Sequence, residues 1–392
     1  MEDARVTGGP AAVDRGPAGT FPASGPVTAP AGAARPEDYA ASGGQMRPLT
    51  VFTGSGWDLF KIHIRNYILT ILTLGVYSFW ARVRVRKYLW ENTVLLGENL
   101  EYTGTGGELF KSFLVVMLLG GLGMAAVYAC MLLVPLAAPF IVPVILVPVG
   151  HFASYQALRY RLTRTRWHGI RGNMDGGAAR YAAAGSGYSL LTLLTLFICM
   201  PLETARLTAK RLNASFFGSR RVGFSGRAKP LFASWLKSYI LLALLGAGAA
   251  LVLYGVGIDD VSTPAAEDIM PLVLGFFVIS FGVLALAGLF TILYRAAVVR
   301  WLFGNLTFGD MRFDAKHYRA WGLFKLMLGN ALLLLFTLGI AYPWTEIRTL
   351  RFFLSSIRYA GDPRLRDLLQ DTLPERSRGE GLLDALDVDL AI

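Results

Sequence analysis

The sequence predicts an all-α polytopic integral membrane protein with internal three-helix repeats, four firm transmembrane helices and up to seven membrane segments. Hydrophobic residues make up 54% of the 392 positions and charged residues only 17%, with a mean hydropathy of +0.47. A soluble protein carries about 25% charged residues. The charges are also clustered, since residues 112–158 contain no Lys, Arg, Asp or Glu. That stretch alone is long enough for two helices that cross a bilayer.

A polar arm and a polar tail flank the predicted membrane domain. Residues 1–48 are rich in Pro, Ala and Gly, which predicts a disordered arm, and they lack the apolar run of a signal peptide. Residues 361–392 are also polar and are predicted to form a tail. The membrane domain between them, 49–360, divides into predicted repeat units of about 52–180, 181–310 and 313–360.

Six uncharged stretches predict seven membrane segments, because the second stretch can hold two helices with a turn near Pro135–Pro139. The segments at 66–81, 181–202 and 326–345 are the short or weak ones, and the other four helices are the firm ones. The stretches are Asn66–Ala81, Ser112–Leu158, Tyr181–Leu202, Ser238–Ile258, Ile269–Tyr294 and Leu326–Thr345.

The basic residues predict which side of the membrane each loop faces. Lys and Arg collect in cytoplasmic loops, so we assign the net charge of +11 to such loops and not to nucleic-acid binding. The loops on both sides of 181–202 are basic, so a full crossing there would place one of them outside. The favoured interpretation is a re-entrant or interfacial segment. The alternative is a true span that breaks the positive-inside rule.

The chain also matches itself at two gapless offsets. An offset of 122 residues aligns Leu72–Leu74 with Leu194–Leu196 and Arg84 with Arg206. An offset of 264 residues aligns the first membrane segment with the last, pairing Trp57 with Trp321, Asn66 with Asn330, Trp80 with Trp344 and Arg84 with Arg348.

A nine-residue box, aromatic-Ser/Thr-Gly-x4-Leu-Phe, occurs at 52–60, 102–110 and 224–232. It predicts a turn in which Gly adopts a positive φ, followed by an interfacial aromatic residue and a helix. A phosphate cradle at Gly104–Gly107 is disfavoured, because the lysine of a nucleotide-binding loop is missing.

The run Leu72–Arg86, followed by Tyr102–Phe110, resembles the YjgN-like family of bacterial inner-membrane proteins, domain of unknown function 898. The resemblance covers roughly Leu49 to Ala360. The second copy departs from the motif, with Phe197 and Leu202 where the first copy has Gly and Trp, and the third copy inserts a proline. The resemblance implies a multi-pass protein of the bacterial cytoplasmic membrane, and it implies no established activity.

Two sets of polar and aromatic side chains are the candidate binding residues. The first set is Trp80, Arg82, Arg84, Trp344, Arg348 and Arg351, and the second set is Asn66 and Asn330. For the first set, the favoured interpretation is an aromatic belt with snorkelling arginines, and the alternative is a cytoplasmic-face site for an anionic lipid headgroup or solute. For the second set, the favoured interpretation is hydrogen bonds between helices, and the alternative is a pore or substrate ligand.

Other polar residues indicate no catalytic chemistry. Glu203 with Arg206, and Glu346 with Arg348, are expected to form local ion pairs. The two cysteines and four histidines show no metal-ligand spacing, so we expect no metal and no cofactor. No nucleophile lies beside a base in the sequence, so we expect no enzyme. No span carries a central charge, which argues against a proton relay.

Two functions remain. Repeated short helices favour transport of a solute or ion across the bacterial cytoplasmic membrane. The alternative is an anionic-lipid-binding or scaffolding protein with no transport activity. The expected partners are the lipid bilayer and anionic headgroups, without nucleic acid, and the sequence leaves the oligomeric state open.

Overall fold

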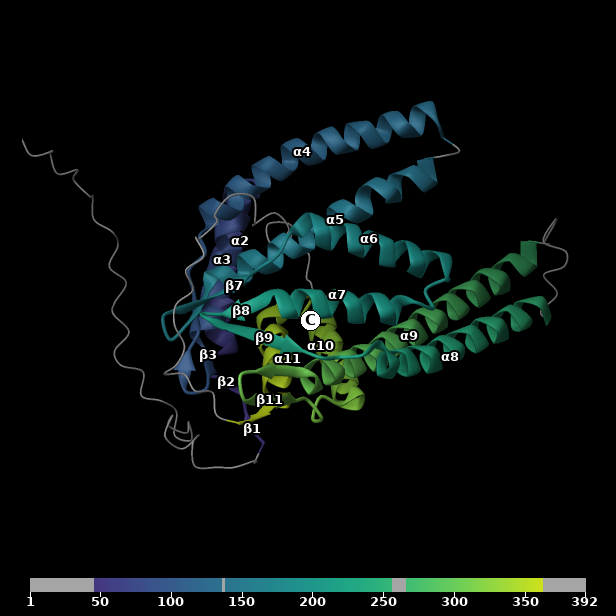
Figure 1. Cartoon of the computed structure of the whole chain (residues 1–392). Helices are drawn as coiled ribbons and strands as arrows, with labels where there is room; N and C mark the ends of the chain where they lie inside the picture. The colour runs from purple at the N-terminus through teal and green to yellow at the C-terminus, as the bar shows by residue number, and fades with distance from the viewer. Residues whose placement is uncertain (1–45, 136–137, 256–265, 362–392) are drawn as a thin grey trace, which may run out of the picture.

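The computed structural model describes residues 46–135, 138–255 and 266–361. Most of the predicted arm at 1–48 and nearly all of the predicted tail at 361–392 lie outside these residues. Figure 1 shows the described chain, in which helical pairs extend from an end built of short strands.

The described helices form five consecutive pairs. Three pairs are short (α2–α3, α6–α7 and α10–α11) and two are long (α4–α5 and α8–α9). The bounds are α2 Gly56–Leu72, α3 Ser78–Glu91, α4 Gly106–Leu133, α5 Ala138–Arg164, α6 Ala178–Leu194, α7 Met200–Ala214, α8 Ala228–Gly255, α9 Ala266–Gly304, α10 Ala320–Phe336 and α11 Tyr342–Ser356.

The strands before, between and after the pairs form two antiparallel sheets. One has nine strands in the order β1-β12-β11-β10-β9-β8-β7-β6-β5, and the other has the order β2-β3-β4. Single residues, Leu49 and Leu100, join the two sheets at β1–β2 and at β4–β5. The bounds are β1 Arg47–Pro48, β2 Thr50–Phe52, β3 Thr93–Leu95, β4 Glu98–Asn99, β5 Glu101–Tyr102, β6 Thr165–Trp167, β7 Ile170–Met174, β8 Ser215–Phe217, β9 Arg220–Phe224, β10 Leu306–Phe308, β11 Met311–Asp314 and β12 Arg358–Ala360.

A buried cluster joins strands that are far apart in the sequence. Leu96, Trp167, Met311 and Tyr359 pack together, and the Trp167 indole donates a hydrogen bond to the Leu95 carbonyl (3.0 Å). First and last strands also meet, since β1 pairs with β12. The strand end therefore holds the two ends of the described chain together.

The predicted all-α class is wrong because of these strands. Most of them lie in the connections that the sequence treats as basic loops, and each has only two to five residues. Strands this short show no alternation of polar and apolar residues that a sequence pattern can detect.

The prediction of four firm transmembrane helices is also wrong. Within the described ranges, no helix combines the length with the apolar character that a bilayer crossing requires. The uncharged stretches do contain the long helices α4, α5, α8 and α9. However, an absence of charge describes composition, whereas a span needs one helix with a continuous window of high hydropathy.

The three short or weak segments each fold back on themselves. The segment 66–81 is interrupted by a turn in which Leu74 and Gly75 have φ of 51° and 92°. Leu196 and Phe197 take the same role in 181–202, and Leu338 and Gly339 in 326–345. The predicted three-helix unit is therefore wrong, because its first segment is itself a two-helix hairpin.

A threonine closes each of these turns in the same way. The Thr73 hydroxyl donates to the Leu69 carbonyl and accepts from the Tyr77 N–H (2.8 and 2.9 Å). Thr195 and Thr337 make the matching pairs of bonds. These bonds satisfy backbone groups that a helix end leaves unpaired. The α6 and α10 helices begin 122 and 264 residues after α2, at the two sequence offsets.

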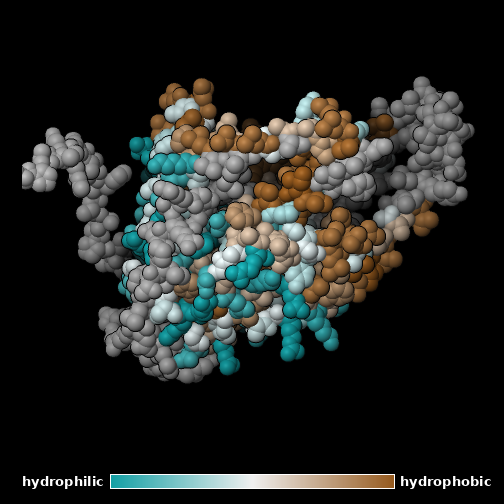
Figure 2. Space-filling view, turned by 45° about the horizontal axis from the view of Figure 1, so that its top comes forward, coloured by the Kyte–Doolittle hydropathy of each residue, from teal (hydrophilic) through white to brown (hydrophobic). Residues whose placement is uncertain are grey.

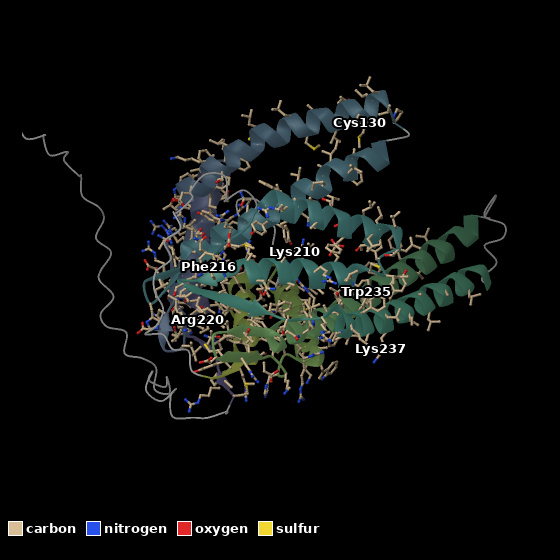
Figure 3. The ribbon with its side chains drawn as sticks, in the orientation of Figure 1. Cys130, Lys210, Phe216, Arg220, Trp235 and Lys237 are labelled. Atoms are coloured by element: carbon tan, nitrogen blue, oxygen red, sulfur yellow. The ribbon has the colours of Figure 1, made fainter. Side chains whose placement is uncertain are left out.

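The molecule has a polar end and an apolar end. Figure 2 shows hydrophilic side chains gathered toward the strand end and hydrophobic side chains over the far parts of the helices. Figure 3 places Phe216 and Arg220 at the strand end and Cys130 near the far end of α4. The α6–α7 turn also lies away from the strands (Figure 1).

Candidate functional site

The turns of the three short hairpins are covered with exposed apolar side chains. We call residues 72–76, 194–198 and 336–340 the apolar tips. Leu74 is 95% exposed, Leu338 91% and Leu196 70%. All three also have a positive φ, which costs an L-residue about 1–2 kcal/mol. Residues that are both strained and exposed do not serve internal packing, so the tips are suited to contact something outside the described chain.

The spacing that recurs in the three boxes is explained by packing, and the predicted positive φ of its glycine is wrong. Gly54, Gly104 and Gly226 are not among the described glycines with a positive φ. A Cβ at these positions would lie 2.5–2.7 Å from the ring of the aromatic residue two positions earlier. The leucines of the three boxes, Leu59, Leu109 and Leu231, are fully buried. The box is therefore a packing motif at the start of α2, α4 and α8.

Trp80 and Trp344 each pack on the start of a neighbouring helix. Trp80 lies against Phe110 of α4 (ring centroids 5.8 Å) and covers Gly106. Trp344 lies against Phe60 of α2 (5.3 Å) and covers Gly56. Trp80 therefore joins α3 to the next helical pair, and Trp344 joins the last described pair to the first by packing α11 on α2.

The four predicted arginines have different surroundings. Arg351 donates to the Gly54 carbonyl (2.6 Å), and Arg82 lies over the Phe79 ring. Arg84 lies over the Tyr77 ring at 5.6 Å. Arg348 is exposed and lies beside Gly329 of α10. Contacts join the α3 residues to α2, α3, α4 and Tyr77, and the α11 residues to α2, β2, α10 and the loop after β2. The six residues are thus placed as two sets and not as one site.

The two asparagines hold the helices of their own hairpins together. Asn66 is buried, donates to the Ala81 carbonyl (3.3 Å) and accepts from Arg84 (3.4 Å). Asn330 donates to the Thr345 carbonyl (3.5 Å) and to the Thr349 hydroxyl (3.0 Å). These bonds agree with the favoured interpretation of hydrogen bonds between helices.

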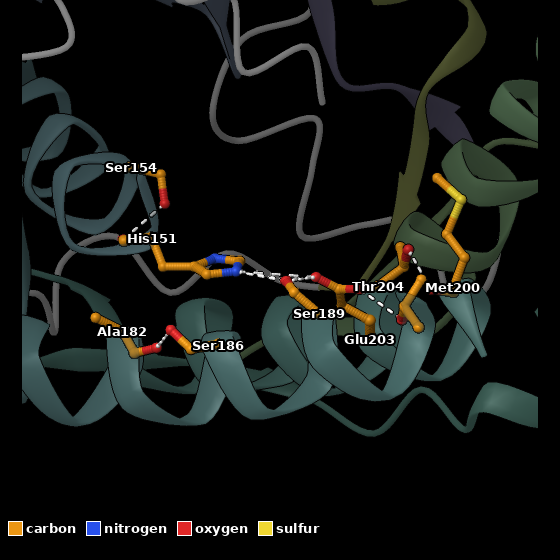
Figure 4. A network of polar contacts seen from close by, with 9 residues as sticks. His151, Ser154, Ala182, Ser186, Ser189, Met200, Glu203 and Thr204 are labelled. Atoms are coloured by element: carbon orange, nitrogen blue, oxygen red, sulfur yellow. Dashed lines mark hydrogen bonds and ion pairs between the residues drawn. The ribbon is translucent and has the colours of Figure 1, made fainter. Parts of the chain in front are cut away.

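A polar network that the sequence did not reveal joins α5, α6 and α7 (Figure 4). Glu203 accepts hydrogen bonds from Ser189 (2.6 Å) and Thr192 (2.7 Å) and does not form the expected pair with Arg206. His151 Nε2 lies 2.8 Å from the Ser189 hydroxyl and 3.9 Å from Glu203. Similarly, Glu346 contacts His63 of α2 (3.3 Å) and not Arg348. Both carboxylates therefore link different elements.

Burial sets the charge state of His151. Desolvation lowers the pKa of His151 below 6.5, the nearby Glu203 opposes this shift, and Arg211 adds to it. The ring also covers Gly185 of α6, where a Cβ would lie 2.6 Å from it, and contacts the Tyr181 ring edge-on. The imidazole is thus neutral at pH 7.

The free energy of unfolding is expected to fall in acid because of His151. Below pH 6.5 the unfolded chain binds the proton first, so stability is lost as the pH falls from 6.5 through the lowered folded pKa. Thermal unfolding of the full-length chain in detergent, followed from about pH 7.5 to about pH 5.5, measures the slope of stability against pH. The slope should be smaller in His151→Gln. An equal slope in both proteins would contradict this assignment.

The sequence did not reveal this network because its residues lie on three different helices, α5, α6 and α7. No local spacing joins His151 to Ser189 or to Glu203. The one available signal was polar residues within uncharged stretches: His151 in 112–158, and Ser189 and Thr192 in 181–202.

Comparisons with known proteins place the chain among bacterial proteins. A family model described as "Bacterial protein of unknown function (DUF898)" matches residues 48–385. The inner membrane protein YjgN of Salmonella typhimurium is 44% identical over 69 residues, 18% of this chain and 18% of that protein. Inner membrane protein YjgN of Escherichia coli K12 is 33% identical over 121 residues, 31% of this chain and 29% of that protein. The matches thus span less than a third of these relatives, and no solved structure matches.

Proposed function

Because the chain belongs to the DUF898 family of bacterial proteins, whose relatives above are named inner membrane proteins, we propose that it binds the lipid bilayer through its three apolar tips. The observation that carries this proposal is the exposure of strained leucines at all three tips, above all Leu74 and Leu338. The resemblance expected from the sequence is confirmed by the family match, and the names of the relatives support the bacterial inner membrane as the location.

The hydrophobic effect supplies the driving force at the tips. Transfer of a fully exposed leucine from water to an apolar environment is worth about 1.5–3 kcal/mol. Each tip presents several exposed apolar side chains, and each threonine bonds one backbone carbonyl of its hairpin. Backbone groups that are already bonded enter lipid at lower cost than unbonded ones.

The polar end suits contact with the aqueous phase. Arg221 and Arg312 are exposed on its strands, and Arg220 lies beside them. Lys and Arg face the cytoplasm in inner-membrane proteins. We therefore propose that the strand end faces the cytoplasm, which is the side that the sequence predicts for most basic loops.

A labelling experiment tests the proposal. Cys130 and Cys199 are replaced, and a single cysteine is placed at Leu338 or, as the control, at Ser219 between β8 and β9. Each full-length protein carries an environment-sensitive fluorophore and is reconstituted into phospholipid vesicles. We expect a blue-shifted emission at position 338 and water-like emission at 219. Water-like emission at both positions would overturn the proposal.

A second candidate function is transport of a solute or proton, and the network around Glu203 favours it. His151, Ser189 and Glu203 form a continuous hydrogen-bonded path between α5 and α7. Vesicles that contain the chain and a pH-sensitive dye would show proton movement that Glu203→Gln abolishes. If the unmodified chain moves no protons, the transport function is wrong and only the lipid-binding proposal remains.

We expect no enzymatic activity from the same network. Ser189 donates its proton to Glu203, so His151 must donate to the serine oxygen and cannot act as the base that activates it.

A further inference from the structure

We infer that each short hairpin carries one binding site for the phosphate of an anionic phospholipid, centred on Arg84, Arg206 and Arg348. This inference rests on the proposed contact between the tips and the bilayer. It places three separate sites where the sequence gives six candidate residues, and it adds Arg206, for which the sequence predicts an ion pair with Glu203.

The three arginines occupy the same position in their hairpins. Each lies six residues after the first residue of the second helix, which is Ser78 in α3, Met200 in α7 and Tyr342 in α11. At 1.5 Å per residue, each lies about 9 Å along the helix from the tip. Apolar surfaces enter the boundary between headgroups and acyl chains by about 5–10 Å. A tip inserted to that depth brings the arginine to the level of the lipid phosphates.

The guanidinium groups of Arg206 and Arg348 are available to a ligand. Both side chains are exposed, and neither has a hydrogen bond or ion pair to another described residue. The acidic residues that could neutralise them, Glu203 and Glu346, are engaged by Ser189, Thr192 and His63. Arg84 is more buried, and its bond to Asn66 Oδ1 (3.4 Å) orients it while leaving its other donors for a phosphate.

The other predicted arginines are less suited to this role. Arg351 donates a hydrogen bond to the Gly54 carbonyl (2.6 Å), and it lies over the Phe52 ring. Arg82 lies over Phe79 within α3. A phosphate at either position would compete with interactions that hold the fold.

Local charge favours an anionic lipid over a zwitterionic one. The second helix of each hairpin has more basic than acidic residues. There are four basic residues and one acidic residue (Glu91) in α3, three and one (Glu203) in α7, and two and one (Glu346) in α11. A zwitterionic headgroup brings its own cation, which such a surface repels. Each basic residue near an anionic surface contributes about 1 kcal/mol.

A matched pair of double variants tests the inference. Arg206→Gln with Arg348→Gln removes two of the proposed sites. Arg312→Gln with Arg319→Gln removes the same charge from β11 and from the start of α10, away from the tips, where both side chains are also exposed. The full-length proteins in detergent are titrated with fluorescent phosphatidylglycerol and, separately, with fluorescent phosphatidylcholine.

In the tip-side variant, phosphatidylglycerol is expected to bind about fivefold more weakly at the two altered sites and unchanged at the Arg84 site, whereas the control variant should keep the affinity of all three sites. Phosphatidylcholine binding should be similar in both. Equal losses in the two variants would overturn the inference, and so would displacement of the lipid by inorganic phosphate, which would indicate a solute site. These outcomes are separate from failure of the proposed function, which the emission at position 338 reports.

Discussion

Replacing Glu108 with alanine is expected to lower the free energy of unfolding by about 2–4 kcal/mol. Glu108 lies in the first turn of α4 and accepts hydrogen bonds from Arg164 and from the Tyr160 hydroxyl, both at 3.0 Å. The Arg164 side chain is only 7% exposed, so the substitution removes a carboxylate from a buried guanidinium. Denaturant unfolding in detergent, followed by tryptophan fluorescence, measures the change.

The exposed pair Arg221–Asp175 provides the control. Its atoms are 2.8 Å apart, but both side chains are more than half exposed. Solvent screens such a pair, so Asp175→Ala is expected to cost about 1 kcal/mol or less. If the two alanine variants lose the same stability, burial does not distinguish these pairs and the account of α4–α5 is wrong.

Replacing Gly106 with alanine is expected to destabilise the protein by about 1–3 kcal/mol. A Cβ at this position would lie 2.6 Å from the Trp80 ring and 2.8 Å from the Trp80 Cα. The ring can rotate away, but the backbone atom cannot, so α3 must move from α4. The quenching and the wavelength of tryptophan emission, together with the unfolding midpoint, report that displacement.

The adjacent glycine is the matched control for this change. A Cβ at Gly107 would meet nothing within 4 Å, and both glycines lie in the first turn of α4. Alanine at 107 is therefore expected to leave stability unchanged or to raise it by up to about 1 kcal/mol, because alanine favours the helix. Destabilisation by Gly107→Ala equal to that by Gly106→Ala would contradict the proposed Trp80 contact.

The sequence indicated where the short hairpins lie and favoured a re-entrant or interfacial form for 181–202, but it did not indicate the residues at which the three hairpins turn. Segments 66–81, 181–202 and 326–345 were distinguished as short or weak, and basic loops on both sides of 181–202 favoured a re-entrant form. The turns themselves depend on leucine and phenylalanine at positive φ, which residue preferences argue against. The relation of these hairpins to the membrane stays a prediction.

The strands and the Glu203 network were beyond sequence patterns for different reasons. Strands such as Thr165–Trp167 are too short to show a period and are stabilised by partners from other loops. The network needs three segments to meet. By contrast, residue type and repeat offset alone selected Asn66 and Asn330, because amides in apolar surroundings require partners.

The measurement that tests the central claim most directly is the depth of the three apolar tips. Nitroxide labels at positions 74, 196 and 338, with 219 as the control, are compared in reconstituted vesicles for collisions with oxygen, which concentrates in lipid, and with a water-soluble nickel complex. The account predicts that oxygen dominates at all three tips and that nickel dominates at 219. Nickel accessibility at the tips equal to that at 219 would contradict it.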